Sequence, residues 1–242
     1  MEGPGMASTR RRKTRRLILM GSGGHAKVLA DAIRLSGLTI EAVIDVDPNR
    51  IGKMFCGIKI EHEDALGDKY KRGKHFLVNG LGSISGGSLD RRSDLYWNWR
   101  NLGDGWPFAS VIHPSARIAK DVELGEGVQV MCSATINGGA KIGVNTIINT
   151  GAIIEHDVTI EESCHIAPGA IICGGAYIED RTHIGCGAVI IQGKRIGQAC
   201  TVGAGSVVNG DVYRGSTVAG VPARDLQGKA LNWGKTVISN VG

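Results

Sequence analysis

The chain has 242 residues, of which 42% are hydrophobic, and a formal net charge of +5. This length and composition predict a globular protein of one large or two modest domains. No segment approaches the roughly 20 apolar residues that a membrane-spanning helix needs, so we expect no membrane association. Residues 10–16 carry six positive charges and leave the rest nearly neutral. We therefore expect residues 1–16 to be a disordered leader and expect no nucleic-acid partner.

Cysteine usage indicates the compartment. The chain has six cysteines and no CxxC pair. Cys164 and Cys200 take small positions in the repeat described below, where packing is their expected role. Free thiols are typical of a reducing compartment, so the sequence predicts a cytoplasmic protein.

The first third of the chain reads as a small α/β unit. Apolar segments 16–21, 39–45 and 75–82 predict strands, and segment 23–37 predicts a helix whose apolar residues are Val28, Leu29, Ala32 and Ile33. Parallel strands joined by crossovers follow from this alternation. A further helix is predicted over 88–103, with Leu89, Leu95, Tyr96 and Trp99 on one side.

A six-residue repeat fills most of the remaining chain. Stepping by six from Ile112 reaches a branched aliphatic residue every time up to Val208, with no insertion. A second series four residues later is small, with Lys194 as its exception, and we expect it to end at Val212. This period fits neither an amphipathic helix nor an alternating strand, and it is typical of a parallel β-helix. Three six-residue sides would close one coil of eighteen residues.

The segments GSGGHAKV (21–28), ASVIHPSA (109–116), NTGAIIEHD (149–157), SCHIAPGA (163–170) and AGVPAR (219–224) carry a resemblance. They resemble the NeuD/PglD-like family of sialic-acid O-acetyltransferases and nucleotide-sugar N-acetyltransferases, which are hexapeptide-repeat acyltransferases. The resemblance implies a mainly β fold: a C-terminal left-handed parallel β-helix preceded by a small Rossmann-like α/β domain. We expect an α/β domain over 17–107, a β-helix over 108–226 and a tail over 227–242.

The strand-to-helix turn at residues 21–25 is a candidate phosphate site. Its glycines allow close approach of the backbone, and a helix N-terminus favours an anion. The match to a dinucleotide fingerprint is loose. The family resemblance implies a nucleotide-sugar site here, with these residues in contact with the substrate: Gly23, Gly24, His25, Asp45, Leu81 and Gly82.

Three histidines lie in the middle of the repeat, outside both interior series. His165 and His183 are eighteen residues apart, so their side chains should stack roughly 5 Å apart. Subunit contact is the expected role of His183. His156 stands between two carboxylates and has what a general base needs. Neighbouring side chains on a strand point to opposite faces, so Asp157 can reach His156 only if the strand bends; Glu155 is the other candidate partner.

The resemblance assigns further roles. It makes His156 the base with Asp157 as its partner, and it puts Asn149 near the acceptor amine. It also implies that acetyl-CoA contacts His165, Cys186 and Ala204, and that the segment 219–224 closes the cofactor groove. Arg224 in that segment is either a CoA phosphate ligand or a solvated charge. The family implies a homotrimer with active sites between subunits.

These observations and the resemblance predict an acetyl-CoA-dependent N-acetyltransferase that acts on the 4-amino group of a nucleotide-linked 4-amino-4,6-dideoxy sugar. UDP is the first candidate for the nucleotide. We expect direct attack of the amine on the thioester, without a metal. O-acetylation of a sialic acid or similar sugar is the alternative. A γ-carbonic-anhydrase-like metal lyase using His156, His165 and His183 as zinc ligands, and a non-catalytic scaffold, are the hypotheses from other classes.

Overall fold

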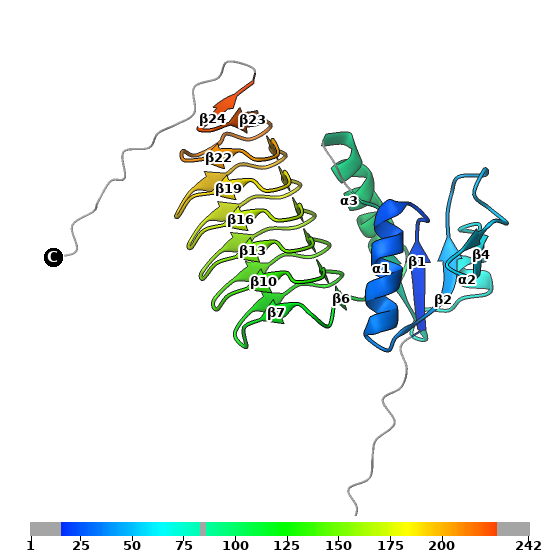
Figure 1. Ribbon diagram of the computed structural model, residues 1–242. Helices are drawn as coiled ribbons and strands as arrows, with labels where there is room; N and C mark the ends of the chain where they lie inside the picture. The colour runs from blue at the N-terminus through cyan, green and yellow to red at the C-terminus, as the bar shows by residue number, and fades with distance from the viewer. Residues whose placement is uncertain (1–15, 83–85, 227–242) are drawn as a thin grey trace, which may run out of the picture.

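The structure is a computed structural model that describes residues 16–82 and 86–226, with the backbone alone for residues 86–88. The predicted disordered leader, apart from Arg16, and the predicted tail lie outside these residues. An α/β unit and a long β-helix stand side by side (Figure 1). In the described part of the chain, no helix is long and apolar enough to cross a membrane.

The α/β unit is a five-stranded sheet in the order β3-β4-β2-β1-β5, flanked by helices. All neighbours are parallel except β3 and β4. The predicted strands and first helix are confirmed. Its elements are β1 (Arg16–Met20), α1 (Gly24–Leu35), β2 (Thr39–Ile44), β3 (Met54–Phe55), β4 (Ile58–Glu61), α2 (Ala65–Asp68), β5 (His75–Asn79) and α3 (Gly86–Asn101).

Burial of apolar faces fixes both long helices. Helix α1 buries Leu29 and Ile33 against the sheet, whereas Val28, which we predicted on the apolar face, is 45% exposed. Helix α3 buries Leu89 and Tyr96 as predicted. The side chain of Arg92 lies on the same stripe of α3 and is fully buried.

The β-helix is built from three sheets of two-residue parallel strands, one of which ends in two longer antiparallel strands. We call the three sheets the domain-facing sheet, the outer sheet and the rear sheet. The domain-facing sheet comprises β6 (Val111–Ile112), β9 (Gln129–Val130), β12 (Ile147–Ile148), β15 (His165–Ile166), β18 (His183–Ile184), β21 (Thr201–Val202), β23 (Thr217–Gly220) and β24 (Ala223–Asp225). The outer sheet, labelled along the front of the β-helix in Figure 1, comprises β7 (Arg117–Ile118), β10 (Thr135–Ile136), β13 (Ile153–Ile154), β16 (Ile171–Ile172), β19 (Val189–Ile190) and β22 (Val207–Val208). The rear sheet comprises β8 (Glu123–Leu124), β11 (Lys141–Ile142), β14 (Thr159–Ile160), β17 (Tyr177–Ile178) and β20 (Arg195–Ile196).

The predicted repeat is confirmed residue by residue. Each aliphatic position pairs with the one eighteen residues on, from Ile112 with Val130 to Ile190 with Val208. The second residue of each strand points into one continuous apolar core, together with most of the small series. Ile112 is the exception at the N-terminal end, where it is 40% exposed because no coil lies below it.

The repeat changes earlier than the sequence indicates. Val212 was predicted as a member of the small series, but it pairs with Ile196, sixteen residues before it, and so takes an aliphatic ladder position. The backbone N–H of Arg195 donates to the carboxylate of Asp211 in this shortened turn. The last coil is therefore two residues shorter, and the chain ends its β-helix in the antiparallel pair β23–β24.

A buried polar network joins the two parts. The Arg92 guanidinium donates to the backbone carbonyls of Asn79, Leu81 and Asn145. The Asn79 amide donates to the Asn145 side chain at 3.0 Å. Gln129 of β9 donates to the Asn79 carbonyl at 2.7 Å. Because buried polar groups are costly unless paired, this network fixes the α/β unit against the domain-facing sheet.

Candidate functional site

His156 and Asp157 form a hydrogen-bonded pair at a corner of the β-helix. The pair lies between the outer and the rear sheet, and His156 Nδ1 is 2.9 Å from an Asp157 carboxylate oxygen. The bend that this contact requires is present, since Asp157 has a φ of 59°. Glu155 instead accepts a hydrogen bond from Asn137 at 3.0 Å. With Nδ1 donating to the carboxylate, His156 Nε2 is left as the basic nitrogen.

Glycines in the neighbouring coils make room for this pair. A Cβ on Gly139, eighteen residues before Asp157, would lie 2.4 Å from an oxygen of its carboxylate. A Cβ on Gly174, eighteen residues after His156, would lie 2.6 Å from His156 Nε2. The imidazole therefore lies over the Gly174 backbone, and 62% of its side chain is exposed.

Asn149 and His165 form a second pair, at the corner between the domain-facing and outer sheets. The Asn149 side-chain amide lies 3.0 Å from His165 Nε2. The backbone N–H of Thr150 donates to the Asn149 side-chain oxygen. The predicted stacking of His165 on His183 is present, with ring centroids 5.0 Å apart in an edge-to-face arrangement. Both histidines lie on the outward face of the domain-facing sheet and are nevertheless buried.

Cys186 and Ala204 lie farther along the same corner as Asn149. Both are exposed, and they stand one coil apart, because the Gly205 N–H donates to the Cys186 carbonyl. Glycines flank each of them, so this corner presents backbone rather than large side chains. The segment 219–224 forms the β23–β24 turn at the end of the domain-facing sheet.

The glycine turn of the α/β unit is held by Asp45. One Asp45 carboxylate oxygen accepts hydrogen bonds from the Ser22 N–H at 2.9 Å and from the Ser22 hydroxyl at 2.5 Å. Its other oxygen accepts the N–H of Asp47. Asp45 therefore fixes the shape of the turn. The resemblance implies that this turn contacts the substrate. The exposed Gly24 opens α1, and a Cβ on either Gly23 or Gly24 would meet nothing within 4 Å.

His25 connects the glycine turn to the β-helix. Its Nε2 lies 2.7 Å from the Gln129 side-chain oxygen, and a Cβ on Gly82 would lie 3.0 Å from the His25 Cβ. Leu81 packs over Gly21. Burial, and to a lesser extent the charge of Arg92, lower the pKa of His25 from 6.5 to about 4. His25 is therefore neutral at neutral pH.

Arg92 is a residue of this region that the sequence analysis missed. It is fully buried, and its described partners are backbone carbonyls. Burial lowers its pKa to about 9. The detectable signal was its position between Leu89 and Tyr96 on the buried stripe of α3.

The structure groups the predicted residues into three places within one chain. Gly23, Gly24, His25, Asp45, Leu81 and Gly82 surround the glycine turn. A second place is the corner with Asn149, His165, Cys186 and Ala204, and the third is the next corner, with His156 and Asp157. The second and third groups lie at different corners of the β-helix, and they make no described contact with each other.

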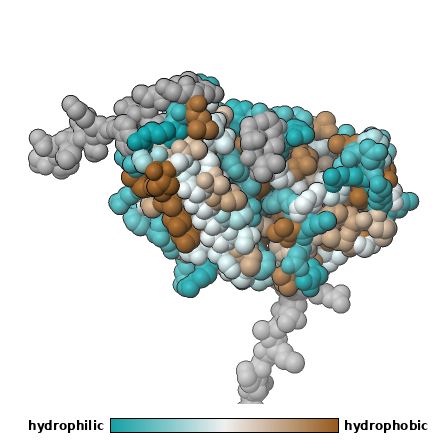
Figure 2. All heavy atoms as spheres, turned by 45° about the horizontal axis from the view of Figure 1, so that its top comes forward, coloured by the Kyte–Doolittle hydropathy of each residue, from teal (hydrophilic) through white to brown (hydrophobic). Residues whose placement is uncertain are grey.

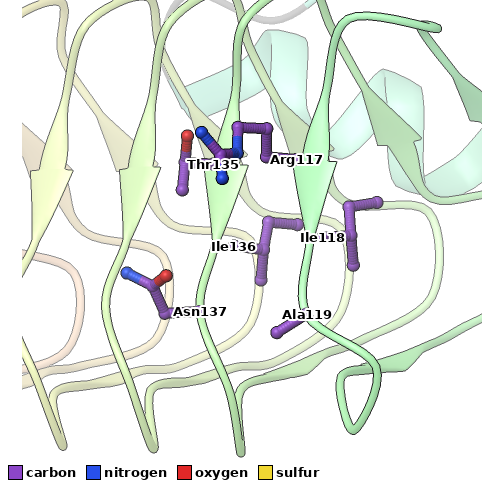
Figure 3. A pocket seen from close by; sticks show the side chains of 6 residues that line it. All are labelled: Arg117, Ile118, Ala119, Thr135, Ile136 and Asn137. Atoms are coloured by element: carbon purple, nitrogen blue, oxygen red, sulfur yellow. The ribbon is translucent and has the colours of Figure 1, made fainter.

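The outer sheet carries a shallow pocket outside these three places. The pocket, about 260 Å³ in volume, lies on β7 and β10 of the outer sheet and includes Asn137, which holds Glu155 (Figure 3). Within residues 16–82 and 86–226, no group of three His, Cys, Asp or Glu side chains is arranged to hold a metal ion.

Two sequence families match the chain. Residues 16–85 match the family described as PglD N-terminal domain. Residues 157–192 match the bacterial transferase hexapeptide (six repeats). No curated protein matches the chain.

Several solved structures are similar over most of the chain. A mutant of perosamine N-acetyltransferase from Caulobacter crescentus, in complex with CoA and GDP-perosamine, is 34% identical, with a TM-score of 0.76 over 86% of this chain and 95% of that one. The acetyltransferase domain of PglB from Neisseria gonorrhoeae, in complex with acetyl coenzyme A, is 29% identical, with a TM-score of 0.77 over 88% and 100%. WeeI from Acinetobacter baumannii is 27% identical, with a TM-score of 0.73 over 88% and 100%.

Gly174→Ala tests the placement of His156. The added methyl group requires the imidazole to move, because its Cβ would lie 2.6 Å from Nε2. Gly174 has no positive φ, so we expect the melting temperature to change little. We expect the catalytic rate to fall at least about tenfold, since small misplacements of a reacting group are costly. The same change in a His156→Ala background should have no further effect; an additive loss would contradict the interpretation.

The burial of His25 at the contact between the two parts predicts that the folded protein loses stability in acid. Its folded-state pKa of about 4 lies below the ordinary 6.5, so the unfolded chain binds the proton first as the pH falls. Stability is then complete above pH 6.5 and declines toward pH 4, by at most about 1.4 kcal/mol per pH unit. His25→Gln, which keeps a donor toward Gln129, should flatten this decline in denaturant titrations between pH 4.5 and 7. Equal slopes in both proteins would count against it.

Proposed function

The chain belongs to the NeuD/PglD-like family of hexapeptide-repeat acyltransferases, whose co-substrate is acetyl-CoA, and on that premise we propose that it N-acetylates a nucleotide-linked 4-amino-4,6-dideoxy sugar. The observation that carries the proposal is the His156–Asp157 pair, in which the carboxylate occupies Nδ1 and leaves Nε2 basic. Such a nitrogen accepts the proton that an attacking amine must lose.

The glycine turn supports a nucleotide-linked acceptor rather than a free sugar. Ser22 and Asp45 hold the turn, and Gly23 and Gly24 leave open space at the N-terminus of α1. Exposed N–H groups at a helix N-terminus favour phosphate. The sequence predicts a UDP-linked sugar, while the Caulobacter relative was crystallised with GDP-perosamine, so both nucleotides belong in the test.

His156 is the general base in the proposed mechanism. Nε2 takes a proton from the acceptor amine, and the Asp157 carboxylate stabilises the imidazolium that results. The amine nitrogen bonds to the thioester carbonyl carbon, and the C–S bond breaks as CoA leaves as its thiolate. Backbone N–H groups of the coil are suited to stabilise the oxyanion formed between these steps. No residue of this chain is acylated on this route.

The corner that carries Asn149, Cys186 and Ala204 suits the co-substrate. Its exposed residues are small and flanked by glycines, so an extended chain with amide groups can lie close to the backbone. Asn149 and His165 lie at the N-terminal end of this track and are already paired with each other. We assign this corner to acetyl-CoA and Asn149 to the acceptor amine.

The incomplete site of one chain supports a homotrimer. His156 and Asn149 flank opposite edges of the outer sheet, so a neighbouring copy is needed to bring one corner to the other. The outer sheet itself carries a column of apolar side chains, visible in brown over the β-helix in Figure 2. Its members are the stacked, half-buried residues Ile153, Ile171, Val189 and Val207. We propose that this column packs against a neighbouring copy.

Thiol release from acetyl-CoA tests the activity directly. Purified protein is assayed with UDP-, GDP- and dTDP-linked 4-amino-4,6-dideoxy sugars, and with the matching hydroxyl sugars and sialic acid. We expect release with an amino sugar and a product heavier by one acetyl group. His156→Ala should lower the catalytic rate by about 10²- to 10⁴-fold, the usual contribution of a general base.

One control variant and two contrary outcomes make this assay decisive. His62→Ala removes an exposed histidine of the α/β unit and should leave the rate unchanged. Turnover of hydroxyl acceptors alone would replace the N-acetylation proposal by O-acetylation. A fully active His156→Ala protein would remove His156 from the mechanism.

Ile171→Lys tests the trimer. A charge in the middle of the apolar column should produce monomers, measured by light scattering, with circular dichroism unchanged and activity lost. Thr159→Lys on the rear sheet is the matched control and should remain trimeric. A monomeric wild-type protein, or a trimeric Ile171→Lys protein, would refute this contact.

A further inference from the structure

His183 is a buried histidine for which the proposed mechanism gives no role. It lies on the outward face of the domain-facing sheet, one coil beyond His165, and only 7% of it is exposed. Its Nδ1 is buried and has no hydrogen-bond partner within the described residues. We propose that His183 is a ligand-binding residue whose Nδ1 forms a hydrogen bond with an uncharged polar group of a bound substrate.

The buried Nδ1 of His183 needs a hydrogen-bond partner that the described residues do not supply. Leaving a buried polar atom unpaired costs about 1–3 kcal/mol, and such atoms in native proteins require an explanation. A purely structural position would be served as well by the isoleucine found two coils earlier in the sheet, at Ile147. A hydrogen bond that forms only when a ligand is bound explains why histidine stands here.

The neighbours of His183 place its ring beside the proposed site. The ring packs edge-to-face against His165, whose Nε2 is paired with Asn149. Cys186, on the proposed acetyl-CoA track, follows three residues later on the same coil. Thr201 is the neighbour of His183 on the next strand of the domain-facing sheet, on the side away from His165.

The electrostatics favour an uncharged ligand group. Burial lowers the pKa of His183, so its imidazole is neutral at neutral pH and can donate or accept one hydrogen bond at each nitrogen. A sugar hydroxyl and an amide of the pantetheine arm both have this chemistry. The inference rests on the proposed function, because that function supplies these two ligands.

Isothermal titration of His183 variants tests the inference without turnover. CoA alone is one probe, and UDP- and GDP-linked amino sugars without CoA are the others. His183→Phe keeps the ring and removes the nitrogen, whereas the side-chain amide of His183→Asn reaches the place of Nδ1. We expect His183→Phe to weaken binding of one ligand about tenfold or more, and His183→Asn to retain affinity within about threefold of the wild type, each tenfold being about 1.4 kcal/mol.

Each arm has a defined outcome. Loss for CoA alone identifies the pantetheine amide, and loss for the nucleotide sugar alone identifies the hydroxyl. Unchanged affinity of His183→Phe for all probes would overturn the inference, as would equal losses in the Phe and Asn proteins, which indicate packing. His62→Phe controls for histidine replacement, and melting temperatures verify folding. Wild-type protein that binds these probes without acetyl transfer would defeat the proposed function and leave this inference standing.

Discussion

The vertical alignment of successive coils constrains both the core of the β-helix and the side chains outside it. The interior ladder of aliphatic residues repeats every eighteen residues, so every outward residue stands directly over a residue of the previous coil. The His156–Asp157 pair exists because Gly139 lies below it and Gly174 above it. The same alignment stacks His165 on His183. The packing of the core thereby fixes the geometry of groups that lie outside it.

A second constraint is the polar contact between the two parts. Arg92 binds backbone carbonyls from β5, from the following loop and from the β-helix. Its charge also helps to lower the pKa of His25. His25 in turn meets Gln129. The glycine turn is thus held at a fixed height along the domain-facing sheet.

Much of the fold was predictable because the hexad repeat has no insertion between Ile112 and Val208. The shortened turn at Asp211 was not, since Val212 also fits the continued period. The β3–β4 hairpin was missed because its signal is one dipeptide, Cys56-Gly57, whose positive φ values suit a two-residue turn. Contacts between distant segments, such as Ser22 with Asp45 and His25 with Gln129, have no periodic signal. Asp157 could be named as a partner, but only the positive φ at the corner lets it reach His156.

The proposed mechanism requires Asp157 to fix the tautomer of His156 so that Nε2 is the free base. The direct measurement is the imidazole ¹⁵N spectrum of the wild-type protein above neutral pH, with His156 assigned by comparison with His156→Ala. We expect Nδ1 to carry the proton and Nε2 to have the chemical shift of an unprotonated nitrogen. A spectrum in which Nε2 is protonated and Nδ1 is free would contradict it.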